Sequence, residues 1–109
     1  MKRAAKKLLN AIGLDLVRLR TPLESNLCLD ERLGFEFEDE ATACISIIQH
    51  NTMLSKRRLV TLYQQVAYCE RYAIPGAFVE CGVWKGGAAG MMALANQQTG
   101  KVRRHLHLF

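Results

Sequence analysis

The fold of this chain is decided by residues 74–94, which read Ile-Pro-Gly-Ala-Phe-Val-Glu-Cys-Gly-Val-Trp-Lys-Gly-Gly-Ala-Ala-Gly-Met-Met-Ala-Leu. Pro75-Gly76 predicts a turn, and the apolar run Ala77–Val79 is typical of a fully buried parallel strand. A glycine-rich loop follows. Small and straight-chain residues from Gly87 onward predict a helix. The stretch therefore indicates a strand, a glycine loop and a helix in succession.

A second strand is predicted after this helix. The helix should end near Gln97 or Gln98, because Thr99-Gly100 is a turn sequence. Val102–Phe109 then has the composition of a strand. The order strand, helix, strand predicts a β-α-β unit and hence an α/β fold.

The first strand ends in an acidic residue, Glu80, and three glycines follow it at 82, 86 and 87. This arrangement brings a carboxylate and free backbone N–H groups to one strand-to-helix crevice. Ligands of open α/β sheets bind in such crevices, at the carboxyl ends of the strands, and a helix N-terminus favours an anionic group.

The glycine spacing narrows the choice of ligand. A Walker A loop is excluded because Ala88 and Ala89 stand where it requires Lys and Ser/Thr. Trp84 replaces the second glycine of a dinucleotide fingerprint, which disfavours a nicotinamide cofactor. What remains suits a ligand with an ammonium group for Glu80 and a carboxylate for the helix N-terminus. The methionyl end of S-adenosylmethionine carries both.

Residues 79–87, preceded by Ile74-Pro75-Gly76, resemble the first motif of the macrocin O-methyltransferase family, S-adenosylmethionine-dependent enzymes of antibiotic and sugar tailoring. Thr52-Met53, the helix after it and residues 105–109 resemble the family's order of elements. The resemblance implies a Rossmann-like methyltransferase fold and O-methylation of a small-molecule acceptor, the hydroxyl of a sugar or natural product. The cofactor-binding residues that it implies are Glu80, Cys81, Gly82, Val83, Trp84, Gly86 and Gly87.

The resemblance leaves the rest of the chemistry unassigned. The family is associated with a divalent metal such as Mg²⁺, but no metal-binding position and no catalytic residue is identified in this sequence. Cys81 is expected to pack and to contact the cofactor through its backbone, because no histidine is placed to activate its thiol. The Thr52-Met53 loop reaches the cofactor in this interpretation, and an ordinary helix-entry loop is the alternative.

The chain is short for the fold it resembles. We interpret its 109 residues as the N-terminal part of a longer enzyme, with a helical and loop region at 1–54 and the start of the methyltransferase domain at 55–109. The acceptor site is then expected beyond Phe109, so that the chain alone is inactive. Residues 77–82 are expected to present an unpaired strand edge, which predicts self-association or a homo-oligomer.

Charge changes sign along the sequence. The net charge is +5 overall, made up of +5 in residues 1–20, −6 in residues 21–50 and +6 in residues 51–109. This alternation argues against a continuous nucleic-acid footprint. No apolar run is long enough for a signal peptide or an integral membrane segment, so we expect a cytoplasmic protein.

The basic N-terminus supports a second interpretation of a different class. Ala5, Leu8, Leu9 and Ile12 fall at helical spacing, which predicts an amphipathic helix over residues 1–13. Such a helix would make the chain a non-catalytic binding module that meets a membrane surface or an acidic partner. The other interpretation is a terminal helix that docks on the domain or frays.

Residues 23–73 are predicted to form a loop and then two helices. The acidic cluster Glu36, Glu38, Asp39 and Glu40 is interpreted as a solvated face and not as a metal site. Asp39 is predicted to cap a helix that runs to Ile48. Ser55 is predicted to cap a longer helix that buries Leu59, Leu62, Tyr63 and Val66 and that Pro75-Gly76 terminates.

Histidine and cysteine residues give no metal motif. His105 and His107 share one side of the second predicted strand and are interpreted as surface residues, because no third ligand is spaced to join them. Cys28, Cys44, Cys69 and Cys81 include no Cys-x-x-Cys pair. We expect four reduced, buried thiols.

Overall fold

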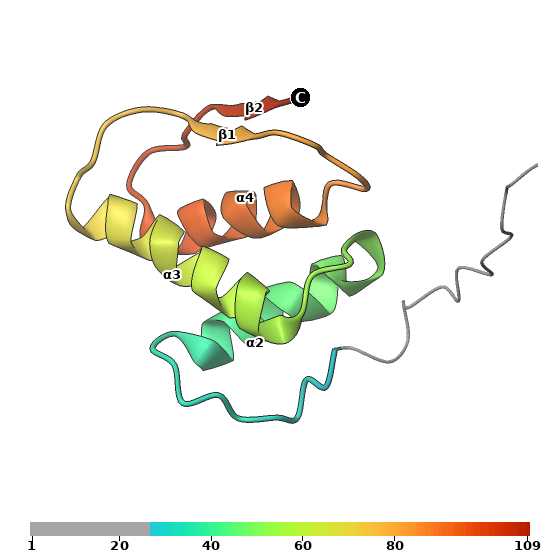
Figure 1. The fold of residues 1–109 in the computed structure, drawn as a ribbon. Helices are drawn as coiled ribbons and strands as arrows, with labels where there is room; N and C mark the ends of the chain where they lie inside the picture. The colour runs from blue at the N-terminus through green and yellow to red at the C-terminus, as the bar shows by residue number, and fades with distance from the viewer. Residues whose placement is uncertain (1–26) are drawn as a thin grey trace, which may run out of the picture.

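The computed structural model describes residues 27–109, so the predicted helix over residues 1–13 lies outside the described residues. Within residues 27–109 the structure has three α-helices, a short 3-10 helix and two strands (Figure 1). In chain order they are α2 (Glu38–Ile48), η2 (Gln49–Asn51), α3 (Lys56–Arg71), β1 (Phe78–Glu80), α4 (Gly87–Thr99) and β2 (Leu106–Leu108).

The two strands form a parallel sheet, as the β-α-β prediction requires. Phe78 lies opposite Leu106, Val79 opposite His107 and Glu80 opposite Leu108. The pairing continues past the strands, because the N–H of Phe109 donates to the carbonyl of Glu80 at 2.9 Å. In Figure 1 the sheet lies above α4 and α3, and α2 lies on the far side of these helices.

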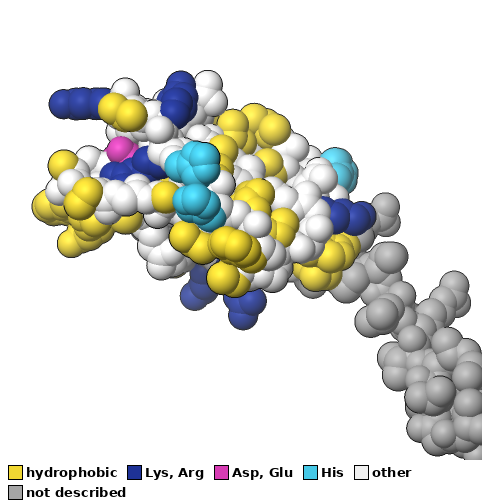
Figure 2. Space-filling view, turned by 90° about the horizontal axis from the view of Figure 1, so that it is seen from above, with side chains coloured by type: hydrophobic (Ala, Val, Ile, Leu, Met, Phe, Trp, Pro, Cys, Tyr) yellow, Lys and Arg dark blue, Asp and Glu magenta, His cyan; other side chains and the backbone are white. Residues whose placement is uncertain are grey.

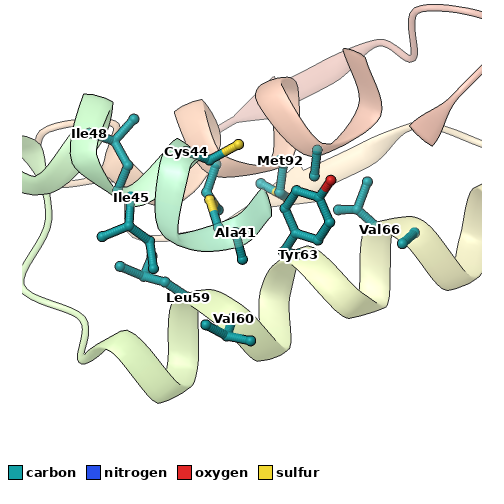
Figure 3. Close-up of a cluster of buried hydrophobic side chains, with 12 residues drawn as sticks. Ala41, Cys44, Ile45, Ile48, Leu59, Val60, Tyr63, Val66 and Met92 are labelled. Atoms are coloured by element: carbon teal, nitrogen blue, oxygen red, sulfur yellow. The ribbon is translucent and has the colours of Figure 1, made fainter. Parts of the chain in front are cut away.

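Three helices share one hydrophobic core (Figure 3). The buried residues of α2 and α3 recur at the three- and four-residue spacing of one helix face, and Tyr63 lies at the centre of the group. The buried apolar side chains are Ala41, Cys44, Ile45, Ile48, Leu59, Val60, Tyr63, Val66, Ala67, Ala89, Met91, Met92 and Ala95. Leu59, Tyr63 and Val66 confirm the predicted face of α3, and Leu62 is half-buried against the same core.

The outer face of the sheet differs from the prediction of a fully buried strand. Phe78 packs against the core, but Val79 keeps 57% of its surface exposed. The reason is that no described element covers this face. Figure 2 looks at the molecule from this side, and hydrophobic side chains are exposed there.

The second strand is shorter than predicted because a polar network takes its first residues. The N–H of Arg104 donates to Asn96 Oδ1 at 3.0 Å, and Asn96 Nδ2 donates to the carbonyl of Val102 at 3.1 Å. Arg104 Nε donates to Glu70 Oε1, and its Nη1 donates to the carbonyl of Gly76 at 2.8 Å. These bonds join the end of α3, the end of α4 and the starts of both strands.

The acidic cluster at the start of α2 contains one carboxylate that is not solvated, that of Glu38, the first residue of the helix. Glu38 is 5% exposed, which corrects the prediction of a solvated face at this residue. It accepts hydrogen bonds from the N–H groups of Leu33 and Gly34, each at 2.8 Å. It also forms an ion pair with Lys56, whose Nζ lies 3.0 Å from Glu38 Oε1. Lys56 also donates to the carbonyls of Leu29 and Glu31. The pair therefore fastens the segment before α2 to the start of α3.

The start of α2 is also corrected. Phe37, in a left-handed conformation at φ 59°, occupies the cap position, and no side chain caps the helix. Asp39 lies one residue inside the helix and pairs with Arg32 on the surface. Ser55 does cap α3, because its side chain accepts from the N–H of Arg58.

Acid should destabilise the fold through Glu38. The hydrogen bond from Leu33, together with those from Lys56 and Gly34, outweighs burial and lowers the pKa of Glu38 from 4.5 to about 2. A depressed carboxyl pKa stabilises the fold above pH 4.5, and that contribution is lost as the pH falls toward 2. We expect urea titrations to show this loss in the wild type and a smaller loss in Glu38→Gln. Glu40→Gln, which changes an exposed carboxylate, is the control; equal pH slopes for both variants would contradict the prediction.

Candidate functional site

A glycine-rich loop joins the end of β1 to the start of α4. Gly82 and Gly86 adopt left-handed conformations, at φ 80° and 79°, which side chains other than glycine rarely tolerate. The N–H groups of Gly82 and Val83 donate to the carbonyl of Phe109, at 2.9 and 3.1 Å. The loop therefore turns at Gly82 across the end of β2 and enters α4 through Gly86.

The first turn of α4 has no side-chain cap. Gly86 is the cap residue, and its carbonyl accepts from the N–H of Gly90 at 2.8 Å. The N–H groups at the start of a helix have no partner within the helix and carry its partial positive charge. They are thus available to an acceptor from outside the helix.

The loop between η2 and α3 lies directly against this helix start. A Cβ atom at Gly87 would fall 2.4 Å from the carbonyl oxygen of Asn51 and 2.6 Å from the Cβ of Thr52. Asn51 Nδ2 also donates to the carbonyl of Lys85, at 3.4 Å. Only glycine at 87 permits this contact, which brings residues 51–54 beside residues 80–88.

These two loops enclose a cavity of about 140 Å³. Residues 51–54 line one side of it, and the other side is formed by Glu80, Gly82, Trp84, Lys85, Gly86, Gly87 and Ala88. A groove of about 520 Å³ adjoins the cavity, since both are lined by Leu54, Glu80 and Ala88. The two hollows together are large enough for a small-molecule ligand.

Glu80 carries the most unusual polar atom of the cavity. Its Oε2 is buried and has no hydrogen-bond partner among residues 27–109. A buried oxygen without a partner costs about 1–3 kcal/mol, and more when it is charged. A ligand that donates a hydrogen bond or brings a positive charge would remove this cost.

The structure brings five of the seven predicted cofactor residues to the cavity. Glu80, Gly82, Trp84, Gly86 and Gly87 line it. Cys81 and Val83 do not. Cys81 is exposed, and Val83 is half-buried and contributes its N–H to Phe109.

Trp84 and Lys85 form the exposed rim. The Lys85 ammonium lies 4.7 Å from the centroid of the Trp84 ring, and 48% of the tryptophan surface is exposed. This cation–π contact restrains two long side chains at the mouth of the site. Lys85 lies within the motif at residues 79–87, but the sequence analysis did not predict it as a site residue.

Asn51 and Leu54 were also missed by the sequence analysis. Thr52 and Met53 were placed near the motif only by resemblance, and the structure brings all four residues to the cavity. The two loops are more than 25 residues apart in the sequence, so no local sequence pattern predicts that they meet. The one sequence feature related to this contact is the second glycine of Gly86-Gly87, which permits the close approach.

The cysteines are free, but they are not all buried. Cys44 is buried, which confirms the prediction at that position, and burial raises the pKa of its thiol. Cys69 is half-buried, while Cys28 and Cys81 are exposed, so the prediction was wrong for these two. Cys81 directly follows the last residue of β1.

A larger cleft lies elsewhere. It measures about 740 Å³ and is lined by residues 73–77 and 101–105, at the amino ends of the strands. Its carboxylate, Glu70, is already paired with Arg104 and Asn96. Size alone therefore does not identify the site, and the smaller cavity is lined by Glu80, which has a buried carboxylate oxygen without a partner among residues 27–109.

Two further features are absent from the described residues. No group of three or more His, Cys, Asp or Glu residues within 27–109 is placed to hold a metal ion. Within the same range no helix is both long and apolar enough to cross a membrane.

Comparison with known proteins identifies the family. A family model described as Macrocin-O-methyltransferase (TylF) matches residues 20–109. No curated protein matches the chain, and no solved structure does. Because the family match covers most of the sequence, the chain belongs to the macrocin O-methyltransferase family.

Proposed function

We propose that the cavity at Glu80 binds S-adenosylmethionine for the O-methylation of a sugar or natural-product hydroxyl. The family is one of O-methyltransferases, and methyltransferases of this kind use S-adenosylmethionine as donor. The observation that carries the proposal is the buried, unpartnered Oε2 of Glu80, a residue that lines the same cavity as the uncapped start of α4. The amino acid end of S-adenosylmethionine carries a positive ammonium group, which matches Glu80, and a negative carboxylate, which matches the start of α4.

In this proposal each end of the methionyl group has its own partner. Glu80 accepts from the ammonium group, and the N–H groups at the start of α4 hold the carboxylate. Gly82 and Gly86 keep Cβ atoms away from the ligand. Trp84 and Lys85 shield the mouth of the cavity from water, and Met53, 62% exposed, faces them from the opposite loop.

In methyl transfer the main task of the protein is to align the methyl donor with the acceptor hydroxyl. S-adenosylmethionine supplies a methyl group that its sulfonium already activates. The residues of the two loops hold the donor in one orientation, so that an acceptor hydroxyl meets the methyl group in line. The adjoining groove beside Arg57, Arg58 and Leu62 provides space next to the donor.

We also propose that β1, α4 and β2 form part of a Rossmann-like sheet. Support comes from the parallel register and from the site, which lies at the carboxyl end of β1. The cytoplasmic location and the use of Mg²⁺ stay predictions. The alternative of a non-catalytic module depends on residues 1–13, outside the described residues, and no described feature favours it over methyl transfer.

Glu80→Gln should weaken S-adenosylmethionine binding. Calorimetric titration of the wild-type chain should give saturable binding, and loss of one hydrogen bond between charged groups should lower the affinity by about tenfold or more. Gly82→Val should abolish binding, because valine does not tolerate φ 80°. Glu40→Gln is the matched control. Unchanged affinity in Glu80→Gln, or no saturable binding by folded wild-type chain, would contradict the proposal.

Gly87→Ala should damage both stability and binding. The new methyl group would overlap the backbone of Asn51, and overpacking of this kind costs about 1–3 kcal/mol of unfolding free energy. Gly90→Ala is the comparison, because its methyl group meets only a side-chain atom, the Cγ2 methyl of Ile48, at 3.1 Å. Thermal unfolding and the same titration should show the larger loss for Gly87→Ala. Equal effects of the two variants would show that the contact between the loops does not matter.

We propose self-association through the free edge of β1. The backbone groups of Phe78, Glu80 and Gly82 form the hydrogen bonds to β2. The backbone N–H and C=O groups of Val79 and Cys81 therefore lie on the opposite edge of β1, where β2 does not pair. Light scattering should therefore show a mass that rises with concentration, and Val79→Lys should reduce it. A monomer at all concentrations would count against this proposal.

A further inference from the structure

Two histidines lie side by side next to the exposed sheet face. His105 precedes β2 and His107 lies within it, so that their side chains point to the same side of the chain. Their ring centroids are 4.6 Å apart, and both residues are exposed. Figure 2 shows histidine side chains gathered together on this face.

Nothing in the described part of the chain competes for these rings. The sheet register sets His107 opposite Val79, which has no polar side-chain atom. Neither imidazole makes a hydrogen bond or an ion pair with a residue between 27 and 109. Both rings therefore keep a nitrogen available to a ligand from solution.

We propose that His105 and His107 chelate a divalent transition-metal ion, Ni²⁺ or Cu²⁺, through one nitrogen each. A metal–nitrogen bond of about 2 Å puts the ion about 3 Å from each ring centroid. Two centroids 4.6 Å apart then subtend roughly a right angle at the ion. Adjacent positions of square-planar and octahedral shells, which Cu²⁺ and Ni²⁺ adopt, have this angle.

The choice of ion follows from the ligand atoms. Imidazole nitrogen suits first-row transition metals, nickel and copper among them, whereas Mg²⁺ prefers oxygen ligands. This site is therefore different from any Mg²⁺ site of the methyl-transfer reaction, and its two histidines do not line the proposed methyl-donor cavity. Within residues 27–109 there is no third protein ligand, so water or a small ligand completes the shell. The second imidazole raises the affinity because its binding is intramolecular.

Ni²⁺ titration of the full chain tests the proposal. Ni²⁺ is used because Cu²⁺ would oxidise the exposed thiols of Cys28 and Cys81. Calorimetry should give one saturable site, and substoichiometric Ni²⁺ should broaden the imidazole NMR signals of His105 and His107. His105→Gln and His107→Gln should each weaken binding by at least about tenfold. His50→Gln, which changes an exposed histidine on η2, should leave the affinity unchanged.

Three outcomes would overturn the site. Binding that persists in the His105→Gln/His107→Gln double variant would assign the ion to the thiols or to another group. Loss of binding in only one single variant would show a lone histidine and no chelate. Equal affinity for Mg²⁺ would show that oxygen ligands hold the ion. Circular dichroism of each variant, together with S-adenosylmethionine titration, separates these results from unfolding and from failure of the proposed methyl-donor site.

Discussion

The contact between Gly87 and the backbone of Asn51 and Thr52 is the constraint on which the site depends. At this point the start of α4 meets the loop before α3 with no room for a side chain. The contact sets the distance between the two loops, and that distance sets the width of the cavity that they line. A residue with a Cβ would separate them and leave the α4 start open to water.

Two polar networks hold the elements that make this contact. Lys56, 4% exposed at the start of α3, binds Glu38 and two carbonyls of the segment before α2. Arg104 binds Glu70 at the end of α3, and Asn96 of α4 joins the same network. Buried ion pairs contribute little net stability, but breaking one leaves a charge unpaired. Their role here is to fix which segments meet.

The sequence predicted the parts of this fold that depend on local patterns. Turn residues and apolar periodicity located α3, β1 and α4, because Pro75-Gly76 and Ser55 act on their own neighbours in the chain. The parallel pairing of the strands followed from the order of the elements. The burial of Glu38 was missed, since its partner Lys56 is 18 positions away and is indistinguishable in sequence from a surface lysine. Asn51 was missed for the same reason, because its contacts at residues 85 and 87 belong to a distant segment.

The three carboxylates with low exposure show why the candidate site lies where it does. Glu38 has two backbone donors and an ammonium group, and Glu70 has Arg104 and Asn96. Each is a closed structural unit that needs nothing from solution. Glu80 is the exception among the described residues, because its buried Oε2 has no partner. Because the fold satisfies its other low-exposure carboxylates and leaves this one beside an uncapped helix start, a ligand bound there would gain hydrogen bonds that the described residues do not make among themselves, and this is why we place the candidate site at Glu80.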